Sequence, residues 1–183
     1  VPDLDFKAIK ADFPKLTNCY EKPAGDCTLV EGTGKHVLLF GDSHAGMMIP
    51  TFVALAKQHD LTLSIAIRGG CPWQQDLYVP PLAVSGRLVG GDNCRKAKED
   101  VYDRVIPALH PDIIVVMNLA YETPNQKVQY RAADQKSLKI GSPELNALLD
   151  RTTRASVDRL GADARKVVIL EPVPYDPANF DSL

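Results

Sequence analysis

The chain has 183 residues, a length that suits one well-cored domain or a small domain with an appended arm. Hydrophobic residues make up 45% of it and charged residues 24%, which is the composition of a folded globular protein and excludes a disordered or fibrous one. Its 21 basic and 23 acidic residues give a net charge of -2, so no broad basic surface is expected and nucleic acid is excluded as a partner.

The two ends of the chain indicate a piece of a longer protein. It begins with Val1-Pro2, without an initiator methionine or a signal peptide, and it stops at Leu183 shortly after a strand-like segment. The longest apolar stretch, around 113–117, is far shorter than the roughly 20 residues that a membrane-spanning helix needs. We therefore expect no membrane span within these residues.

Residues 1–34 are predicted to form an N-terminal segment, with a short helical arm over 3–13 followed by a disulfide loop. From residue 35 onward the pattern is that of an α/β domain over 35–183. Apolar runs predict four strands, over 37–40, 61–67, 112–117 and 166–170. Amphipathic patterns and capping residues predict three helices between them, over 48–59, 92–109 and 142–160.

This alternation of strands and helices predicts a parallel sheet with helices on both faces. The expected arrangement is doubly wound and flavodoxin-like, with the strand order 2-1-3-4 and a fifth strand missing. Such sheets bind ligands beyond the carboxyl ends of their strands, so function is expected after Phe40, Ile67, Met117 and Leu170. The loop over 68–91 is longer than connections usually are, which favours a functional role for it.

The four cysteines contain no C-x-x-C pair of the kind found in zinc ribbons and redox sites, and we expect no metal. Cys19 and Cys27 flank a turn, and Cys71 and Cys94 bracket the long loop. Closing these two local loops is the least demanding of the three possible pairings, which predicts the disulfides Cys19–Cys27 and Cys71–Cys94. Disulfides indicate an extracytoplasmic domain; the alternative is four unpaired thiols in a cytosolic protein.

Gly41-Asp42-Ser43-His44, here called the GDSH block, follows the first strand and opens a helix. A serine at this point projects from a tight turn, and its own backbone N–H can help to hold a developing oxyanion. The other interpretation is an ordinary capped helix, because Gly, Asp and Ser are common turn and N-cap residues.

The GDSH block after an apolar strand resembles the first block of the SGNH (GDSL-like) hydrolase superfamily, whose serine is an acyl-accepting nucleophile. More narrowly, the later Cys71-Pro72 pair, Cys94 at a helix start and the Val173-Pro174 pair make the chain similar to the extracytoplasmic SGNH domain of acyltransferase family three membrane proteins. The similarity covers about residues 35–175. Proteins of that family O-acylate cell-envelope glycans.

Carried over residue by residue, the resemblance implies Ser43 as the nucleophile and Gly70 as an oxyanion-hole residue. Asn118 stands where the family has its third block, but the chain reads Met-Asn-Leu-Ala there in place of Gly-x-Asn-Asp. An oxyanion role and a plain turn role therefore both stay open for Asn118, and Gly70 has the same alternative. Asp42 and His44 are expected to line the pocket, and a plain helix-start role also stays open for His44.

Trp73 is also placed in the pocket, where its aromatic face and that of Tyr78 would stack on a sugar. Packing of the long loop onto the sheet explains this tryptophan equally well. Both interpretations are kept for Trp73.

The base that a serine nucleophile needs is missing from the chain. His36, His59 and His110 each fall roughly 20 Å away or on the wrong side of the predicted sheet. His44 is poorly placed to take the proton of its direct neighbour. The family's late Asp-x-x-His block does not occur. A chain that stops short of that block is favoured over a natural pseudoenzyme, because an unpaired apolar sheet edge invites aggregation.

The resemblance thus implies the SGNH domain of a membrane O-acyltransferase, inactive as this fragment alone, which passes an acyl group, expected to be acetyl, from an acyl donor to a glycan acceptor. The resemblance further implies a tether to an acyltransferase membrane domain and an extracytoplasmic location, with no cofactor. Two alternatives are kept: a stand-alone SGNH esterase, which uses water as the acceptor, and a non-catalytic glycan-binding domain.

Overall fold

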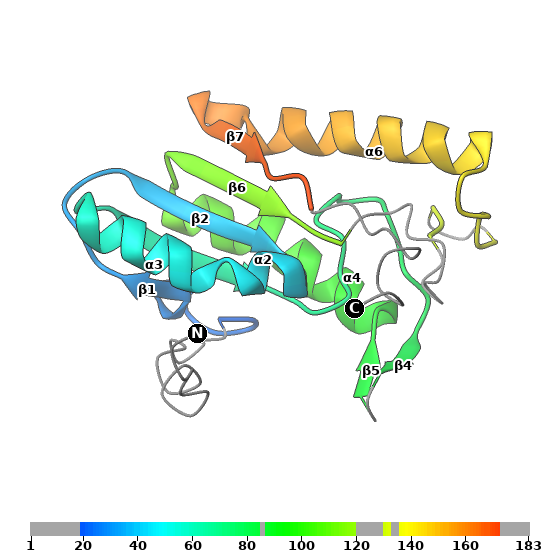
Figure 1. Ribbon diagram of the computed structural model, residues 1–183, viewed down its shortest axis with the longest axis horizontal. Helices are drawn as coiled ribbons and strands as arrows, with labels where there is room; N and C mark the ends of the chain where they lie inside the picture. Colours follow the sequence, from blue (N-terminus) through cyan, green and yellow to red (C-terminus); the bar gives the residue numbers. More distant parts are fainter. Residues whose placement is uncertain (1–18, 85–86, 120–129, 133–135, 173–183) are drawn as a thin grey trace, which may run out of the picture.

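A computed structural model of the chain describes residues 19–84, 87–119, 130–132 and 136–172. Its centre is a sheet in the order β1-β3-β2-β6-β7 (Figure 1). The strands are β1 (Thr28–Val30), β2 (His36–Gly41), β3 (Thr62–Ile67), β6 (Ile113–Met117) and β7 (Lys166–Ile169). All of them run parallel except β1, which pairs with β3 in the antiparallel direction. The four predicted strands are β2, β3, β6 and β7 in chain order. Their predicted order in the sheet, 2-1-3-4, is therefore confirmed as β3-β2-β6-β7.

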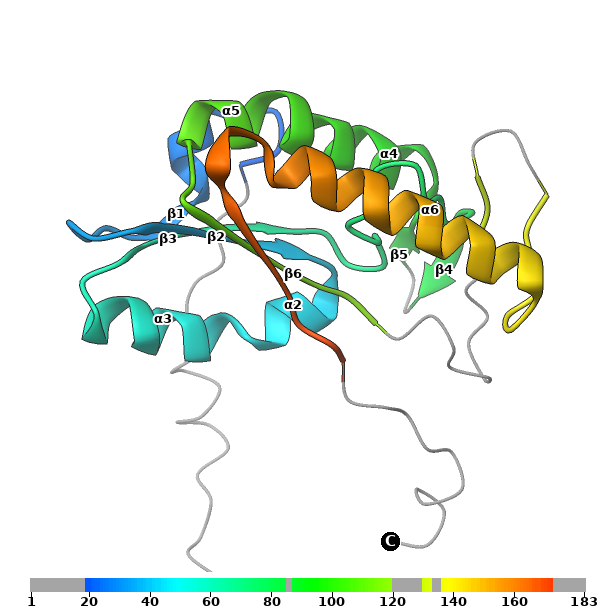
Figure 2. The same cartoon turned by 90° about the horizontal axis from the view of Figure 1, so that it is seen from above.

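Helices cover both faces of this sheet (Figure 2). One face carries α2 (Ser43–Met47) and α3 (Ile49–Gln58). The other carries α4 (Gly91–Asp100), the π-helix η2 (Val101–Val105), α5 (Ile106–Leu109) and α6 (Pro143–Leu160). The short 3-10 helices η1 (Ala24–Cys27) and η3 (Ala162–Ala164) precede β1 and β7. The predicted doubly wound arrangement is thereby confirmed.

The central strand β2 is buried on both sides, which explains its unbroken apolar sequence. Leu38 and Phe40 pack in the core cluster that also holds Tyr102, on the face of α4 to α6. Leu39 points the other way and shares a second cluster with Ile49 of α3. Burial of this kind fixes the register, since a slip by one residue would exchange the two clusters.

Helix α6 begins and ends where the sequence predicts it. The Leu145 N–H donates a hydrogen bond of 3.2 Å to Ser142 Oγ, and Pro143 fits the first turn because its missing N–H has no partner there in any helix. Five side chains of α6 are buried, Leu145, Leu148, Thr152, Ser156 and Leu160. Gly161 follows as the C-cap.

Two features were not predicted. Strand β1 lies inside the N-terminal segment and adds an antiparallel edge to the sheet. The long loop contains a two-stranded hairpin of β4 (Leu82–Val84) and β5 (Arg87–Val89). The predicted arm over 3–13 lies outside the described residues.

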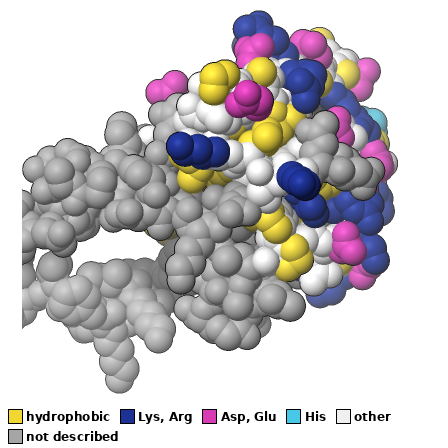
Figure 3. Space-filling model, turned by 90° about the vertical axis from the view of Figure 1, so that its right-hand side faces the viewer, with side chains coloured by type: hydrophobic (Ala, Val, Ile, Leu, Met, Phe, Trp, Pro, Cys, Tyr) yellow, Lys and Arg dark blue, Asp and Glu magenta, His cyan; other side chains and the backbone are white. Residues whose placement is uncertain are grey.

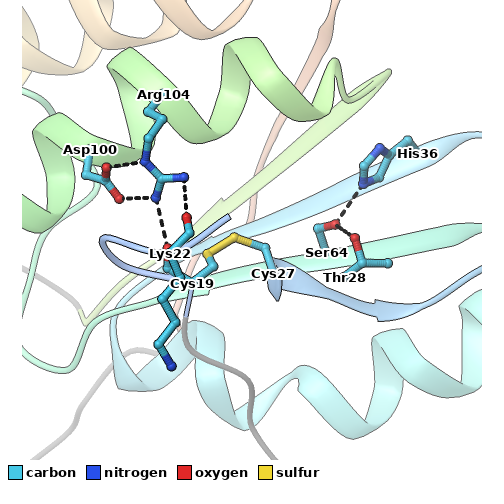
Figure 4. The surroundings of a disulfide bond; sticks show 8 residues. All are labelled: Cys19, Lys22, Cys27, Thr28, His36, Ser64, Asp100 and Arg104. Carbon is cyan, nitrogen blue, oxygen red and sulfur yellow. Dashed lines mark hydrogen bonds and ion pairs between the residues drawn. A yellow bond between two sulfur atoms is a disulfide. The ribbon is translucent and has the colours of Figure 1, made fainter. Parts of the chain in front are cut away.

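The disulfides Cys19–Cys27 and Cys71–Cys94 are both present, as predicted. Figure 4 shows how the first is fastened to the helical layer. Arg104 forms an ion pair with Asp100 and also donates hydrogen bonds to the carbonyl oxygens of Lys22, at 2.6 Å, and Cys19, at 2.9 Å. Among the described residues no helix has the length and apolar character needed to cross a membrane.

Candidate active site

Three neighbouring strands end side by side at one edge of the sheet. Gly41, the last residue of β2, is paired with Ile67 of β3 and with Met117 of β6. Ser43, Gly70 and Asn118 follow these ends by no more than three residues along the chain. The structure therefore brings the three predicted site residues to the same edge, where ligands of doubly wound sheets bind.

Gly41 makes this junction possible because the backbone of β6 passes close to it. A Cβ atom at this position would lie 1.8 Å from Met117 O. The Arg68 N–H donates a hydrogen bond of 2.9 Å to Gly41 O on the other side. A glycine is thus required where β2 turns into the GDSH block.

Ser43 is the first residue of α2, and it is exposed. In the part of the chain that the structure describes, nothing hydrogen-bonds to its hydroxyl. The side chain is therefore accessible to a substrate that approaches the carboxyl edge of the sheet.

Asp42, directly before Ser43, has a buried carboxylate. The His44 N–H donates a hydrogen bond of 2.7 Å to Asp42 Oδ1, and the Leu119 N–H donates one of 3.0 Å to Asp42 Oδ2. Burial raises the pKa of Asp42, and the two N–H donors oppose this shift because they stabilise the charged form. Asp42 accordingly joins two turns of the site.

His44 is half-buried, and its Nδ1 lies 3.5 Å from Asp42 Oδ1. The other three histidines lie elsewhere. His36 is at the amino end of β2, where its Nε2 is 2.8 Å from Ser64 Oγ (Figure 4). His59 and His110 are the C-caps of α3 and α5. Within the described ranges, then, none of the four is hydrogen-bonded to the Ser43 hydroxyl.

Gly70 lies in the turn that follows β3, where the Cys71 N–H donates to Arg68 O at 3.1 Å. Its φ of 69° is in the left-handed region that favours glycine. The disulfide Cys71–Cys94 links the end of this turn to α4. The turn is therefore held both by a hydrogen bond to the end of β2 and by a covalent link.

Asn118 is buried, and its Nδ2 donates a hydrogen bond of 3.0 Å to Leu119 O. That contact is local to the turn after β6. Trp73 has only 3% of its surface exposed and lies in the core cluster with Phe40 and Tyr102. The buried Trp73 ring packs the long loop onto the sheet, so it has no open face to offer a sugar.

Two partners of the site were not predicted from the sequence. The Leu119 N–H reaches Asp42 from the turn after β6. Tyr130 is buried, and burial together with the charge of Asp42 raises its pKa. Neither residue carries a sequence signal, because a backbone N–H has no residue type and Tyr130 comes under the influence of the Asp42 charge only through the fold.

The surroundings of this edge are mixed in character. Figure 3 views the side toward which β2 and β6 point, and its described Lys and Arg side chains alternate with Asp, Glu and hydrophobic ones. A separate pocket beside the carboxyl-terminal half of β3 is lined by Tyr20, Arg68, Pro72 and Lys98 among others, and Ser43 does not line it. No group of three or more His, Cys, Asp or Glu residues in the described segments is arranged to hold a metal ion.

Comparison with known proteins places the chain in a family. A structural neighbour is the periplasmic domain of a lipopolysaccharide acetyltransferase from Salmonella ser. Paratyphi A, with a TM-score of 0.51 and 12% sequence identity. The match covers 94% of this chain and 51% of that one, so the chain spans about half of its neighbour's length. No curated protein sequence matches. The family model of the SGNH domain (fused to AT3 domains) matches residues 12–182, and the chain therefore belongs to this SGNH family.

Proposed function

We propose that the chain is the SGNH part of a larger O-acyltransferase, in which Ser43 accepts an acyl group and passes it to a hydroxyl of a cell-envelope glycan. The observation that carries this proposal is the exposed Ser43 at the start of α2, just beyond the carboxyl end of β2. Membership of the SGNH family and the likeness to an acetyltransferase domain support a role in acyl transfer.

In the proposed reaction Ser43 Oγ forms a bond to the acyl carbon of the donor and gives its proton to a base. The backbone N–H groups of Ser43 and Gly70, with the Asn118 amide, donate hydrogen bonds to the tetrahedral oxyanion. Collapse of this intermediate breaks the bond to the leaving group, which takes the proton from the base. A glycan hydroxyl then attacks the acyl-serine and gives its proton to the same base, which returns it to Ser43 Oγ.

The proposed base is a histidine held by an aspartate, supplied by the full-length protein from outside the described residues. His44 does not take this role, because it is the direct neighbour of Ser43 in the chain and, within the described residues, its ring makes no hydrogen bond to the Ser43 hydroxyl. The requirement is therefore that the remainder of the protein brings an imidazole to within hydrogen-bond reach of Ser43.

We also propose that the domain works on the extracytoplasmic side, tethered to an AT3 membrane domain. Two disulfides support this location, since disulfides persist in oxidising compartments. The family description and the periplasmic neighbour support the tether and the side of the membrane.

The test compares this chain with the full-length protein by p-nitrophenyl acetate hydrolysis and by fluorophosphonate labelling. We expect the full-length protein to be labelled and active, and Ser43→Ala to lose at least about a thousandfold in rate. Ser142→Ala is the matched control, because it removes a serine that only caps α6.

An unchanged rate in the Ser43→Ala variant would overturn the nucleophile. Labelling of Ser43 with hydrolysis but no transfer to added glycan would indicate an esterase. Binding of glycan by a full-length protein that is neither labelled nor active would indicate a binding domain.

A further inference from the structure

The Asp42 carboxylate lies between the turn that carries Ser43 and the turn that carries Asn118. Each of its two oxygen atoms accepts one backbone N–H, from His44 in the first turn and from Leu119 in the second. These two donors are 75 positions apart in the sequence. The carboxylate is therefore a link between separate loops.

This arrangement exceeds what helix capping requires. An N-cap side chain needs one oxygen atom, which satisfies one free N–H at the start of the helix. Asp42 Oδ1 does this for α2, and Asp42 Oδ2 remains for the contact across the sheet. Ser142 shows the ordinary case, with a single bond to Leu145 N at the start of α6.

The position of the link also matters. The Asp42 N–H donates a hydrogen bond of 3.3 Å to Met117 O. Beyond this bond, the segments that follow β2 and β6 enter their separate turns. The Asp42 carboxylate joins these two turns by accepting the N–H of Leu119, one residue beyond Asn118. Among the described residues it ties the two turns together beyond the last residues paired between β2 and β6.

We infer, on the basis of the proposed function, that Asp42 is a positioning residue that holds Ser43 and the Asn118 turn at the spacing the tetrahedral oxyanion requires. Asp42 itself does not touch the reacting atoms. Its action is on the geometry of the donors, and an error of about 1 Å in such geometry costs on the order of a hundredfold in rate.

The ionised carboxylate of Asp42 accepts from both N–H groups, because neither of its oxygen atoms carries a proton. A protonated carboxyl group would present an O–H donor to one of the two N–H groups. The titratable groups that interact with it are His44 on α2, with Nδ1 at 3.5 Å, and the buried Tyr130, whose pKa the charge of Asp42 raises.

The experiment uses the full-length protein with p-nitrophenyl acetate as the probe. Asp42→Ser keeps an N-cap oxygen for His44 N but is too short to reach Leu119 N. Asp42→Asn keeps the shape and one acceptor oxygen but directs an NH₂ group at the second donor. We expect both variants to lose on the order of tenfold to a hundredfold in kcat, with KM changed less than about twofold.

Ser142→Ala provides the matched control, since it removes a cap of comparable strength far along the chain. It is expected to lower the melting temperature with kcat unchanged. If Asp42→Ser retained the wild-type kcat, Asp42 would be only a cap and the inference would be overturned. Failure of both Asp42 variants to fold would overturn it as well, because the residue would then be structural.

The same assay separates this inference from the proposed function. Full activity in Ser43→Ala would show that Ser43 is not the nucleophile, and it would refute the positioning role as well. Loss of activity in Ser43→Ala with wild-type kcat in Asp42→Ser refutes the positioning role alone.

Discussion

Gly41 is the residue at which the approach of β2 to β6 leaves no room for a side chain. In Gly41→Ala the new Cβ would overlap Met117 O, at 1.8 Å, so the strand ends must separate. We expect the free energy of unfolding to fall by about 3 kcal/mol or more. Urea denaturation measures this change.

Gly46→Ala is the matched control for this prediction. Its added Cβ would meet only a side-chain methyl of Ile67, at 3.4 Å, and alanine favours the helix. Stability should therefore change by less than about 1 kcal/mol. Equal effects of the two substitutions would contradict the steric explanation.

Lys98 has a buried amino group that supports the long loop. Its Nζ donates hydrogen bonds of 2.5 Å to the carbonyl oxygens of Gln74 and Leu77. Burial lowers the pKa of Lys98 to about 7 from its ordinary 10.5. Between these two values the unfolded chain holds a proton that the folded protein has released, so stability rises with pH in that window.

The prediction is a difference between wild type and Lys98→Met. The free energy of unfolding of the wild type, relative to this variant, should increase from pH 7 to 9 by up to about 1.4 kcal/mol per pH unit. Below pH 7 the difference should level off. A difference that stays flat from pH 6 to 9 would show that the folded protein keeps the ammonium charged.

At the scale of elements, the two disulfides differ in how much of the chain they restrain. Cys71–Cys94 closes a loop with a sequence separation of 23, and Cys19–Cys27 one of 8. Loop-closure entropy predicts that replacing both Cys71 and Cys94 by serine lowers the free energy of unfolding by about 3 kcal/mol. The same replacement of Cys19 and Cys27 should lower it by about 1 kcal/mol less. Urea melts of both variants test the order, and the reverse order would refute the entropic argument.

The elements that could be predicted from the sequence are those with local signals. β2 has an unbroken apolar run, and α6 has Ser142 and Pro143 at its start and Gly161 at its end. β1 has only three residues, and the contact between its Thr28 and Ser64 spans 36 positions, so its pairing is invisible to local patterns.

The same distinction holds for the site. Ser43 could be predicted because the GDSH block is contiguous and follows a strand. The second contact of Asp42 could not, since Leu119 is 77 positions away and contributes only a backbone N–H. A pattern of residue types carries no information on such a contact.

At the scale of the whole molecule, β7 leaves an apolar edge. Within the described residues β7 pairs with β6 alone, and Val168 and Ile169 are 41% and 48% exposed. Unpaired edges of this kind pair with other chains. We expect this 183-residue chain to self-associate with rising concentration, as measured by sedimentation velocity.

Val168→Lys should reduce this association, because a charge on an edge strand opposes pairing. Leu55→Lys is the matched control, since Leu55 is also 41% exposed but lies on α3, away from the edge. Equal effects of both substitutions would indicate non-specific hydrophobic association. A monomer at all concentrations would refute the prediction.

The connectivity of the cystines has a consequence for biogenesis. Each disulfide joins cysteines that are consecutive in the sequence, and both are complete by residue 94, before β6 and β7. If this segment is exported amino end first, the next of its cysteines to emerge after Cys19 is Cys27, and the next after Cys71 is Cys94. We expect oxidation of the emerging segment to form these two cystines in order, without correction by an isomerase.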